Sequence, residues 1–172
     1  MSIAAICNRE VITVKAEASI AHVANLMRQY HVGDVVVIDG RKNIPVPIGI
    51  VTDRDIVVGV VATELDAEVI TASDIMQRKL FVIGEDFGVF QAIKTMTGKG
   101  VRRLPVVDDK GGLIGIITLD DLFLLISKEL AAMSALVIRE QKNESIKLDI
   151  LPVLKGRDSY GSRQLKAALY LL

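Results

Sequence analysis

Hydrophobic residues in this chain switch twice between strand-like runs and helix-like spacing. Each half begins with a short extended segment and continues with an amphipathic helix, two apolar strands and a second helix. The strand-like segments are 11–14, 35–39 and 48–51 in the first half and 80–83, 104–108 and 113–117 in the second. The order β-α-β-β-α, found twice, predicts an α+β (mixed α/β) fold made of two pseudo-symmetric units packed as one module.

The two halves are copies of one unit. Residues 6–9 align with residues 75–78, and the same offset relates Asp39 to Asp108. The first copy then carries three extra residues, in a turn-rich stretch where a change of length costs little. We therefore place the first repeat at 3–64 and the second repeat at 72–127, followed by a C-terminal helix and tail at 128–172.

Composition narrows the class of protein. Of the 172 residues, 51% are hydrophobic, which is ample for a core, and the formal net charge of +0 argues against broad electrostatic binding of nucleic acid. A single cysteine, Cys7, excludes an intramolecular disulfide, and two histidines are too few for a His-based metal site. No apolar run has the length of a membrane helix and the first residues do not resemble a signal peptide, so we expect a cytoplasmic protein.

A seven-residue phrase occurs at 49–55 and again at 115–121. Each copy runs from glycine through apolar residues to Thr52 or Thr118, and reaches Asp55 or Asp121 three positions later. A strand that leads into a helix start presents free N–H groups that suit a phosphate. The same Thr-x-x-Asp spacing is also close to a capping box, in which the two residues satisfy the helix start themselves. Both interpretations stay open.

Tandem β-α-β-β-α units that each close on Gly-apolar-apolar-Thr-x-x-Asp resemble a CBS-domain pair, the cystathionine β-synthase type also called a Bateman module. The resemblance covers 3–127 and is to stand-alone, bacterial-type proteins. It implies a sensor that binds AMP, ADP, ATP or S-adenosylmethionine in the cleft between units, with no obligatory cofactor and no catalysis. It also implies that Thr52 and Thr118 contact phosphate and that Asp55 and Asp121 bind the ribose. The residues that it assigns to the adenine walls are Ile12, Thr13, Phe81 and Val82.

Arg102 and Arg103 open a strand of the second repeat, where the family often has basic residues that reach phosphate. The matching residues of the first repeat are Gly33 and Asp34. Because an acid repels phosphate, we expect two clefts that are not equivalent. Alternatively, Asp34 pairs with Arg102 or Arg103, or the two arginines are only solvated charges.

The predicted function is regulatory energy sensing, with the signal passed in trans to a protein partner. No nucleophile and base are spaced for catalysis, so an enzyme is not expected. The apolar helices at 56–61 and 122–137 predict a homodimer. The alternative is a structural or oligomerisation module that binds no ligand.

Two further expectations concern local structure. Pro105 lacks an N–H group and so favours an edge strand. The last helix is expected to end near Gln141, after which Ile146, Leu148 and Ile150 alternate like a strand, and 163–172 could form a last amphipathic turn or two.

Overall fold

The computed structural model describes residues 1–77 and 79–155, with 146–155 described by their backbone alone. The chain divides into a compact unit, Met1–Leu124, and a second unit that begins at Leu125. The sheets of both repeats lie within the first unit. Along the described part of the chain, no helix has an apolar stretch of the length needed to cross a bilayer.

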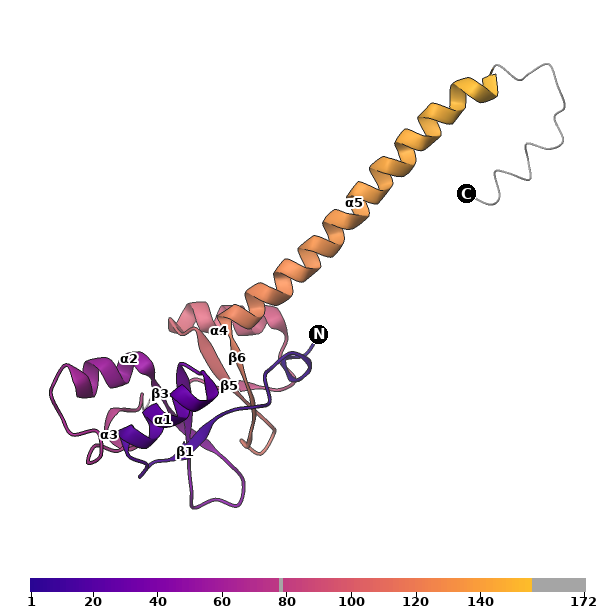
Figure 1. Ribbon diagram of the computed structural model, residues 1–172. Coiled ribbons are helices and arrows are strands. Elements are labelled where there is room, and N and C mark those ends of the chain that lie inside the picture. The colour runs from indigo at the N-terminus through magenta and orange to yellow at the C-terminus, as the bar shows by residue number, and fades with distance from the viewer. Residues whose placement is uncertain (78, 156–172) are drawn as a thin grey trace. The chain divides into compact units, whose positions relative to one another are not determined.

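Each repeat forms a three-stranded sheet in which the middle strand pairs with one parallel and one antiparallel neighbour (Figure 1). The elements of the first repeat are a 3₁₀ turn η1 (Ile3–Ala5), β1 (Thr13–Lys15), α1 (Ile20–Tyr30), β2 (Asp34–Ile38), β3 (Pro47–Thr52), α2 (Asp53–Ile56) and a π-helical turn η2 (Val57–Val61). Those of the second are α3 (Ala72–Ile75), β4 (Ile83–Gly84), α4 (Val89–Lys99), β5 (Arg103–Val107), β6 (Leu113–Thr118) and the start of α5 (Leu119–Lys155). The predicted α+β fold and its β-α-β-β-α order are confirmed.

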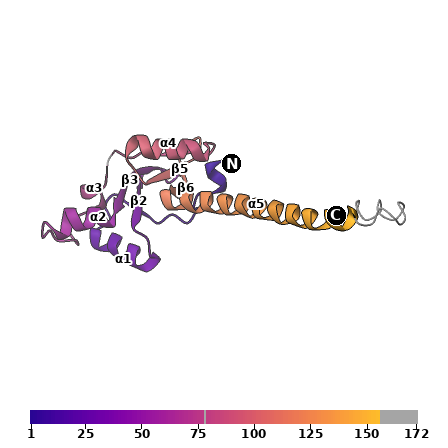
Figure 2. The same cartoon turned by 90° about the horizontal axis from the view of Figure 1, so that it is seen from above.

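Local residues fix the start of α1 and the end of α4. The Ser19 hydroxyl accepts a hydrogen bond from the His22 N–H at 3.2 Å and so caps the start of α1. Gly100 ends α4 in the left-handed conformation, at φ 68°, which glycine adopts without strain. Figure 2 shows the strands of both sheets lying between α1 and α4.

Both faces of each sheet are buried, as the apolar strands predict. In β2, Val35 and Val37 are fully buried in a core that includes residues of α1, while Val36 points the other way. Val36 packs with Ile50 and Ile116 in a separate cluster, which joins the two repeats.

The opening segment of each repeat pairs with the sheet of the other repeat. Asn8 and Ile116 exchange two backbone hydrogen bonds of 2.9 and 2.8 Å, and the Gln77 N–H donates to the Ile50 carbonyl at 3.0 Å. The close approach explains the glycine of the repeated phrase: a Cβ on Gly115 would lie 2.6 Å from the Cys7 sulfur. The two repeats are therefore locked together by backbone pairing as well as by apolar contact.

The prediction that Pro105 occupies an edge strand is wrong, because β5 is the middle strand of its sheet. The reason lies in the neighbouring strand. In the first repeat the Val36 N–H donates to the Ile12 carbonyl at 3.0 Å, and Pro105 stands at the corresponding position without an N–H. The sheet tolerates this because β4 begins only at Ile83, beyond the proline.

The prediction of a strand after Gln141 is also wrong. Ile146, Leu148 and Ile150 lie within α5, which continues to Lys155. Residues 139–149 are rich in Glu, Lys, Gln and Arg, which are good helix formers, and extending a helix that has already formed adds a hydrogen bond for each residue. The predicted turns at 163–172 lie outside the described residues.

Candidate functional site

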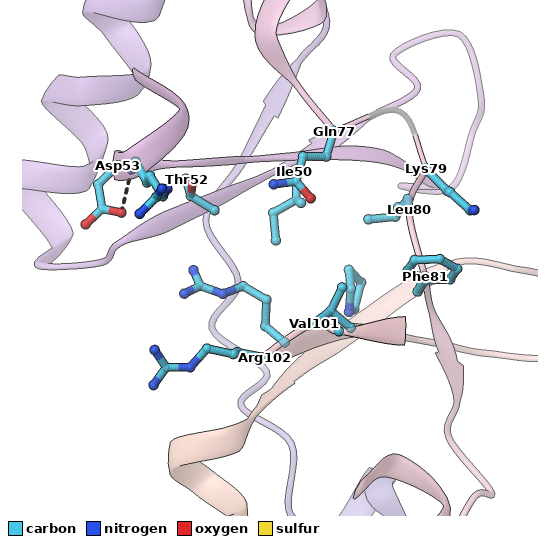
Figure 3. Close-up of a pocket in the computed structure, with 13 residues that line it drawn as sticks. Ile50, Thr52, Asp53, Gln77, Lys79, Leu80, Phe81, Val101 and Arg102 are labelled. Atoms are coloured by element: carbon cyan, nitrogen blue, oxygen red, sulfur yellow. Dashed lines mark hydrogen bonds between the residues drawn. The ribbon is translucent and has the colours of Figure 1, made fainter. Parts of the chain in front are cut away.

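A cavity of about 400 Å³ lies where the end of β3 meets the opening segment and β5 of the second repeat. Figure 3 shows Ile50 and Thr52 on one side of it and Phe81, Val101 and Arg102 on the other. Its walls are Ile50, Thr52, Asp53, Arg54, Gln77, Lys79, Leu80, Phe81, Gly100, Val101, Arg102, Arg103 and Pro105. The cavity therefore draws residues from both repeats.

The walls combine an apolar surface with a strong excess of positive charge. Four of the lining residues are basic (Arg54, Lys79, Arg102 and Arg103), and Asp53 is the one acid among them. Phe81 supplies an aromatic face, with the Lys79 ammonium 5.8 Å from the ring centroid. This combination suits a ligand that has a flat apolar part and an anionic part.

The ion pair predicted between Asp34 and one of the two arginines is present, and its partner is Arg103. Both side chains are partly buried. Burial raises the pKa of Asp34 above its ordinary value, the Arg103 guanidinium opposes that shift, and the Asp53 carboxylate adds to it. Arg102, by contrast, is exposed and lies 3.8 Å from the equally exposed Asp120 carboxylate.

Thr52 and Asp55 form a capping box at the start of α2. The Thr52 N–H and hydroxyl donate to one Asp55 carboxylate oxygen at 2.9 and 2.7 Å, and the Asp55 N–H donates back to the hydroxyl at 3.2 Å. Thr118 and Asp121 repeat this arrangement at the start of α5, with distances of 2.9, 2.6 and 3.2 Å. The capping interpretation of the repeated phrase is therefore confirmed at both positions.

A third Thr-x-x-Asp box shows that the cap alone does not mark a ligand site. The Thr71 N–H and hydroxyl donate to an Asp74 carboxylate oxygen at 2.9 and 2.7 Å, at the start of α3. Neither residue lines the cavity. A role in binding therefore depends on what surrounds the box.

The cavity brings together four of the ten predicted site residues: Thr52, Phe81, Arg102 and Arg103. The other six do not line it. They are Asp55, which lines a separate surface groove with Ile70 and Ile75, and Thr118, Asp121, Ile12, Thr13 and Val82.

Arg54, Lys79 and Gln77 line the cavity but are absent from the predicted set. Arg54 is in the first turn after Thr52, where the sequence alone favours a solvated charge. Lys79 and Gln77 lie in the opening segment of the second repeat, which pairs with the sheet of the first, and no pattern along the chain predicts that pairing. Among residues 1–77 and 79–155, no cluster of His, Cys, Asp and Glu could hold a metal ion.

Relatives of known sequence match the paired repeats. A protein of Methanopyrus kandleri is 38% identical over 122 residues, which are 71% of this chain and 61% of that one. A 17.7 kDa protein of Acidianus ambivalens is 32% identical over 68% of each chain. An inosine-5′-monophosphate dehydrogenase of Methanocaldococcus jannaschii is 31% identical over 66% of this chain but only 21% of the enzyme, so the match gives no evidence for that activity here.

Solved structures agree with the fold. A CBS-domain protein from Burkholderia ambifaria superimposes with a TM-score of 0.65 at 28% identity, over 73% of this chain and 93% of that one. The CBS domain pair of protein MJ0100, solved in complex with 5′-methylthioadenosine and S-adenosyl-L-methionine, gives a TM-score of 0.64 at 25% identity, over 73% and 99%. The CBS domain family model matches residues 3–61 and 72–128. The chain belongs to the CBS domain family and carries two of its domains in tandem.

Proposed function

We propose that this CBS pair is a regulatory module that binds an adenosine-containing ligand in the cavity between its repeats. The observation that carries the proposal is the cavity itself, where an apolar surface around Phe81 and Val101 lies beside four basic side chains. The complex of the MJ0100 pair with two adenosine compounds supports the same class of ligand.

Each part of the ligand has a complementary part of the wall. An adenine ring is flat and largely apolar, and it fits against Phe81, Leu80 and Ile50. Phosphate groups carry negative charge and several acceptor oxygens, which Arg102 and Arg103 can bind with paired N–H donors. AMP, ADP and ATP fit this description best, and S-adenosylmethionine is the less anionic candidate.

Ligand binding in such a module regulates by favouring one arrangement of the repeats over another. The effect on a partner is limited by the difference in ligand affinity between the two arrangements, typically about 1–3 kcal/mol. We propose that the signal passes to a protein partner in trans, as expected of an energy sensor.

Self-association is the second element of the proposal. Along α5, Ile126, Leu130, Met133 and Val137 lie three and four positions apart and are 38–65% exposed. This spacing is typical of the seam of a coiled coil, and we propose that α5 of a second copy packs against it.

Light scattering tests this element. The wild-type chain should have the mass of a homodimer and a Leu130→Glu variant that of a monomer; a wild-type monomer would contradict the proposal.

A module that binds no ligand is the alternative, and one observation favours it. The Thr52 hydroxyl donates to the Asp55 carboxylate and Arg103 is paired with Asp34, so these groups already have protein partners. In that case the Asp34–Arg103 pair only holds the repeats together.

A thermal-shift panel separates the two. AMP, ADP, ATP, S-adenosylmethionine and adenosine are each added to the wild-type chain. At a hundredfold excess over Kd a true ligand stabilises the fold by about 2.7 kcal/mol, which is a shift of several degrees.

The matched variants of this panel are Phe81→Ala and Phe90→Ala. Phe81 lines the cavity, whereas Phe90 is 84% exposed on α4 and does not. The ligand-induced shift should fall in Phe81→Ala and persist in Phe90→Ala. If no compound of the panel shifts the wild-type protein, the alternative stands.

A further inference from the structure

Asp34 and Arg103 hold the same position in the two repeats. They are 69 residues apart, which is the offset between the copies, and each opens the middle strand of its sheet. The sheet registers agree, because Asp34 pairs with Thr52 and Arg103 pairs with Thr118. The ion pair thus joins two equivalent positions across the boundary between repeats.

Aligned positions of the two repeats differ in charge where one of them lines the cavity. Every basic residue of the cavity has an acidic or uncharged counterpart in the other repeat. The counterparts are Asp120 for Arg54, Glu10 for Lys79, Gly33 for Arg102 and Asp34 for Arg103. An anionic ligand is therefore favoured on one side of the pair and repelled on the other.

Asp34 stands at the border of these two regions. Its carboxylate holds a guanidinium that lines the basic cavity, so a ligand phosphate and Asp34 compete for Arg103. A phosphate monoester offers three acceptor oxygens and up to two negative charges, whereas the carboxylate offers two oxygens and one charge. Four basic side chains line the cavity that would receive the phosphate, and Asp53, which also lines it, opposes the negative charge of both competitors.

We infer that Asp34 is an internal competitor that makes the cavity select its ligand by charge. The inference rests on the proposed function and adds a determinant of specificity to it. A phosphorylated adenosine displaces Asp34 from Arg103, whereas an uncharged adenosine occupies the apolar wall and leaves the ion pair in place.

The competition also supplies a route for the signal. Asp34 lies on β2 and Arg103 on β5, so the bond that the phosphate breaks is one that ties the two sheets together. An uncharged ligand leaves this tie intact. Only the anionic ligand therefore changes how strongly the strand openings of the two repeats are held to each other.

Calorimetric titration of the full chain with AMP and with adenosine tests the inference. Asp34→Asn keeps the shape of the side chain and removes its charge. We expect it to bind AMP at least tenfold more tightly than the wild type and adenosine within twofold of it. The matched control is Asp120→Asn, which removes the exposed partner of Arg102, and its AMP affinity should stay within twofold.

A charge exchange provides the second variant. Asp34→Arg combined with Arg103→Asp retains an ion pair at the same place but moves the arginine to the other repeat. Its thermal midpoint should stay close to that of the wild type, while its AMP affinity falls at least tenfold. A double variant that binds AMP as the wild type does would overturn the inference.

The outcomes distinguish this inference from the function on which it rests. Wild-type protein that binds neither AMP nor adenosine refutes both. Wild-type protein that binds them, with an Asp34→Asn variant whose AMP affinity is unchanged or whose affinity for both compounds rises equally, refutes the competition and leaves the adenosine site standing.

Discussion

The strand openings of the two repeats and the contacts that lock the repeats together have diverged to different extents. At the openings of β2 and β5, the first repeat has Gly33 and Asp34 where the second has Arg102 and Arg103. The locking contacts keep the same backbone hydrogen bond in both repeats, since the Asn8 N–H donates to the Ile116 carbonyl at 2.9 Å and the Gln77 N–H donates to the Ile50 carbonyl at 3.0 Å. A backbone contact constrains the residue that makes it, whereas a side chain at the edge of a cleft is free to change its charge. The duplication thus kept one scaffold and produced one basic site.

The largest expected effect compares how well each locking contact tolerates an added Cβ on the glycine of the repeated phrase. A Cβ on Gly115 would lie 2.9 Å from the Asn8 carbonyl oxygen, a backbone atom, as well as against Cys7. A Cβ on Gly49 would meet only the Met76 side chain among its nearest atoms. Gly115→Ala should lower the free energy of unfolding by about 2 kcal/mol and Gly49→Ala by less, because a methionine can move.

Urea denaturation measures both values, with Gly98→Ala as the control. No atom lies within 4 Å of the position that its Cβ would occupy, so this helical substitution should stabilise α4 by about 0.5–1 kcal/mol. Equal losses in Gly115→Ala and Gly49→Ala would show that the two locking contacts are equally rigid.

A smaller effect compares capping boxes inside and outside the cavity. Thr52→Ala and Thr71→Ala each remove a cap, so each should cost about 1 kcal/mol of stability. Only Thr52 lines the cavity, and only its loss should also weaken AMP binding. Thermal unfolding with and without AMP separates the two effects, and an equal loss of binding in both variants would remove Thr52 from the site.

The smallest expected effect is on the pH dependence of stability, and it compares two carboxylates, Asp34 and Asp39. Burial raises the pKa of Asp34, so the folded state holds its proton to a higher pH than the unfolded state does. The contribution of Asp34 to the free energy of unfolding should therefore fall as the pH rises from 3.8 through the raised pKa of the folded state. Hydrogen bonds from Arg41 lower the pKa of Asp39, so its contribution is present above 3.8 and lost as the pH falls below it. Stability measured against pH for Asp34→Asn and Asp39→Asn should deviate from the wild type in opposite directions.

The periodicity of the sequence was sufficient to predict the fold. Alternation and helical spacing are local, and they placed the elements of both repeats. The errors arose where a neighbour decided the outcome. The position of Pro105 depends on where β4 begins, and the alternation of Ile146 and Leu148 is overridden by the helix that precedes it.

The site could be predicted only in part, for the same reason. Arg102, Arg103 and Phe81 were predicted from the resemblance to the CBS family, and all three line the cavity. Arg54 and Lys79 lie on different repeats and reach one cavity only because the sheet of each repeat pairs with the opening segment of the other. No pattern along the chain encodes that meeting.

The pairing of Asn8 with Ile116 and of Gln77 with Ile50 means that the copied stretch of sequence is not an independent folding domain. A cut between 64 and 72 leaves each copy with its own opening segment, so Ile116 would lose Asn8 and Ile50 would lose Gln77. Each fragment would then present an unpaired strand edge to its surroundings. Such fragments are complementary, and mixing them should restore the whole fold because each carries the strip of backbone that the other lacks.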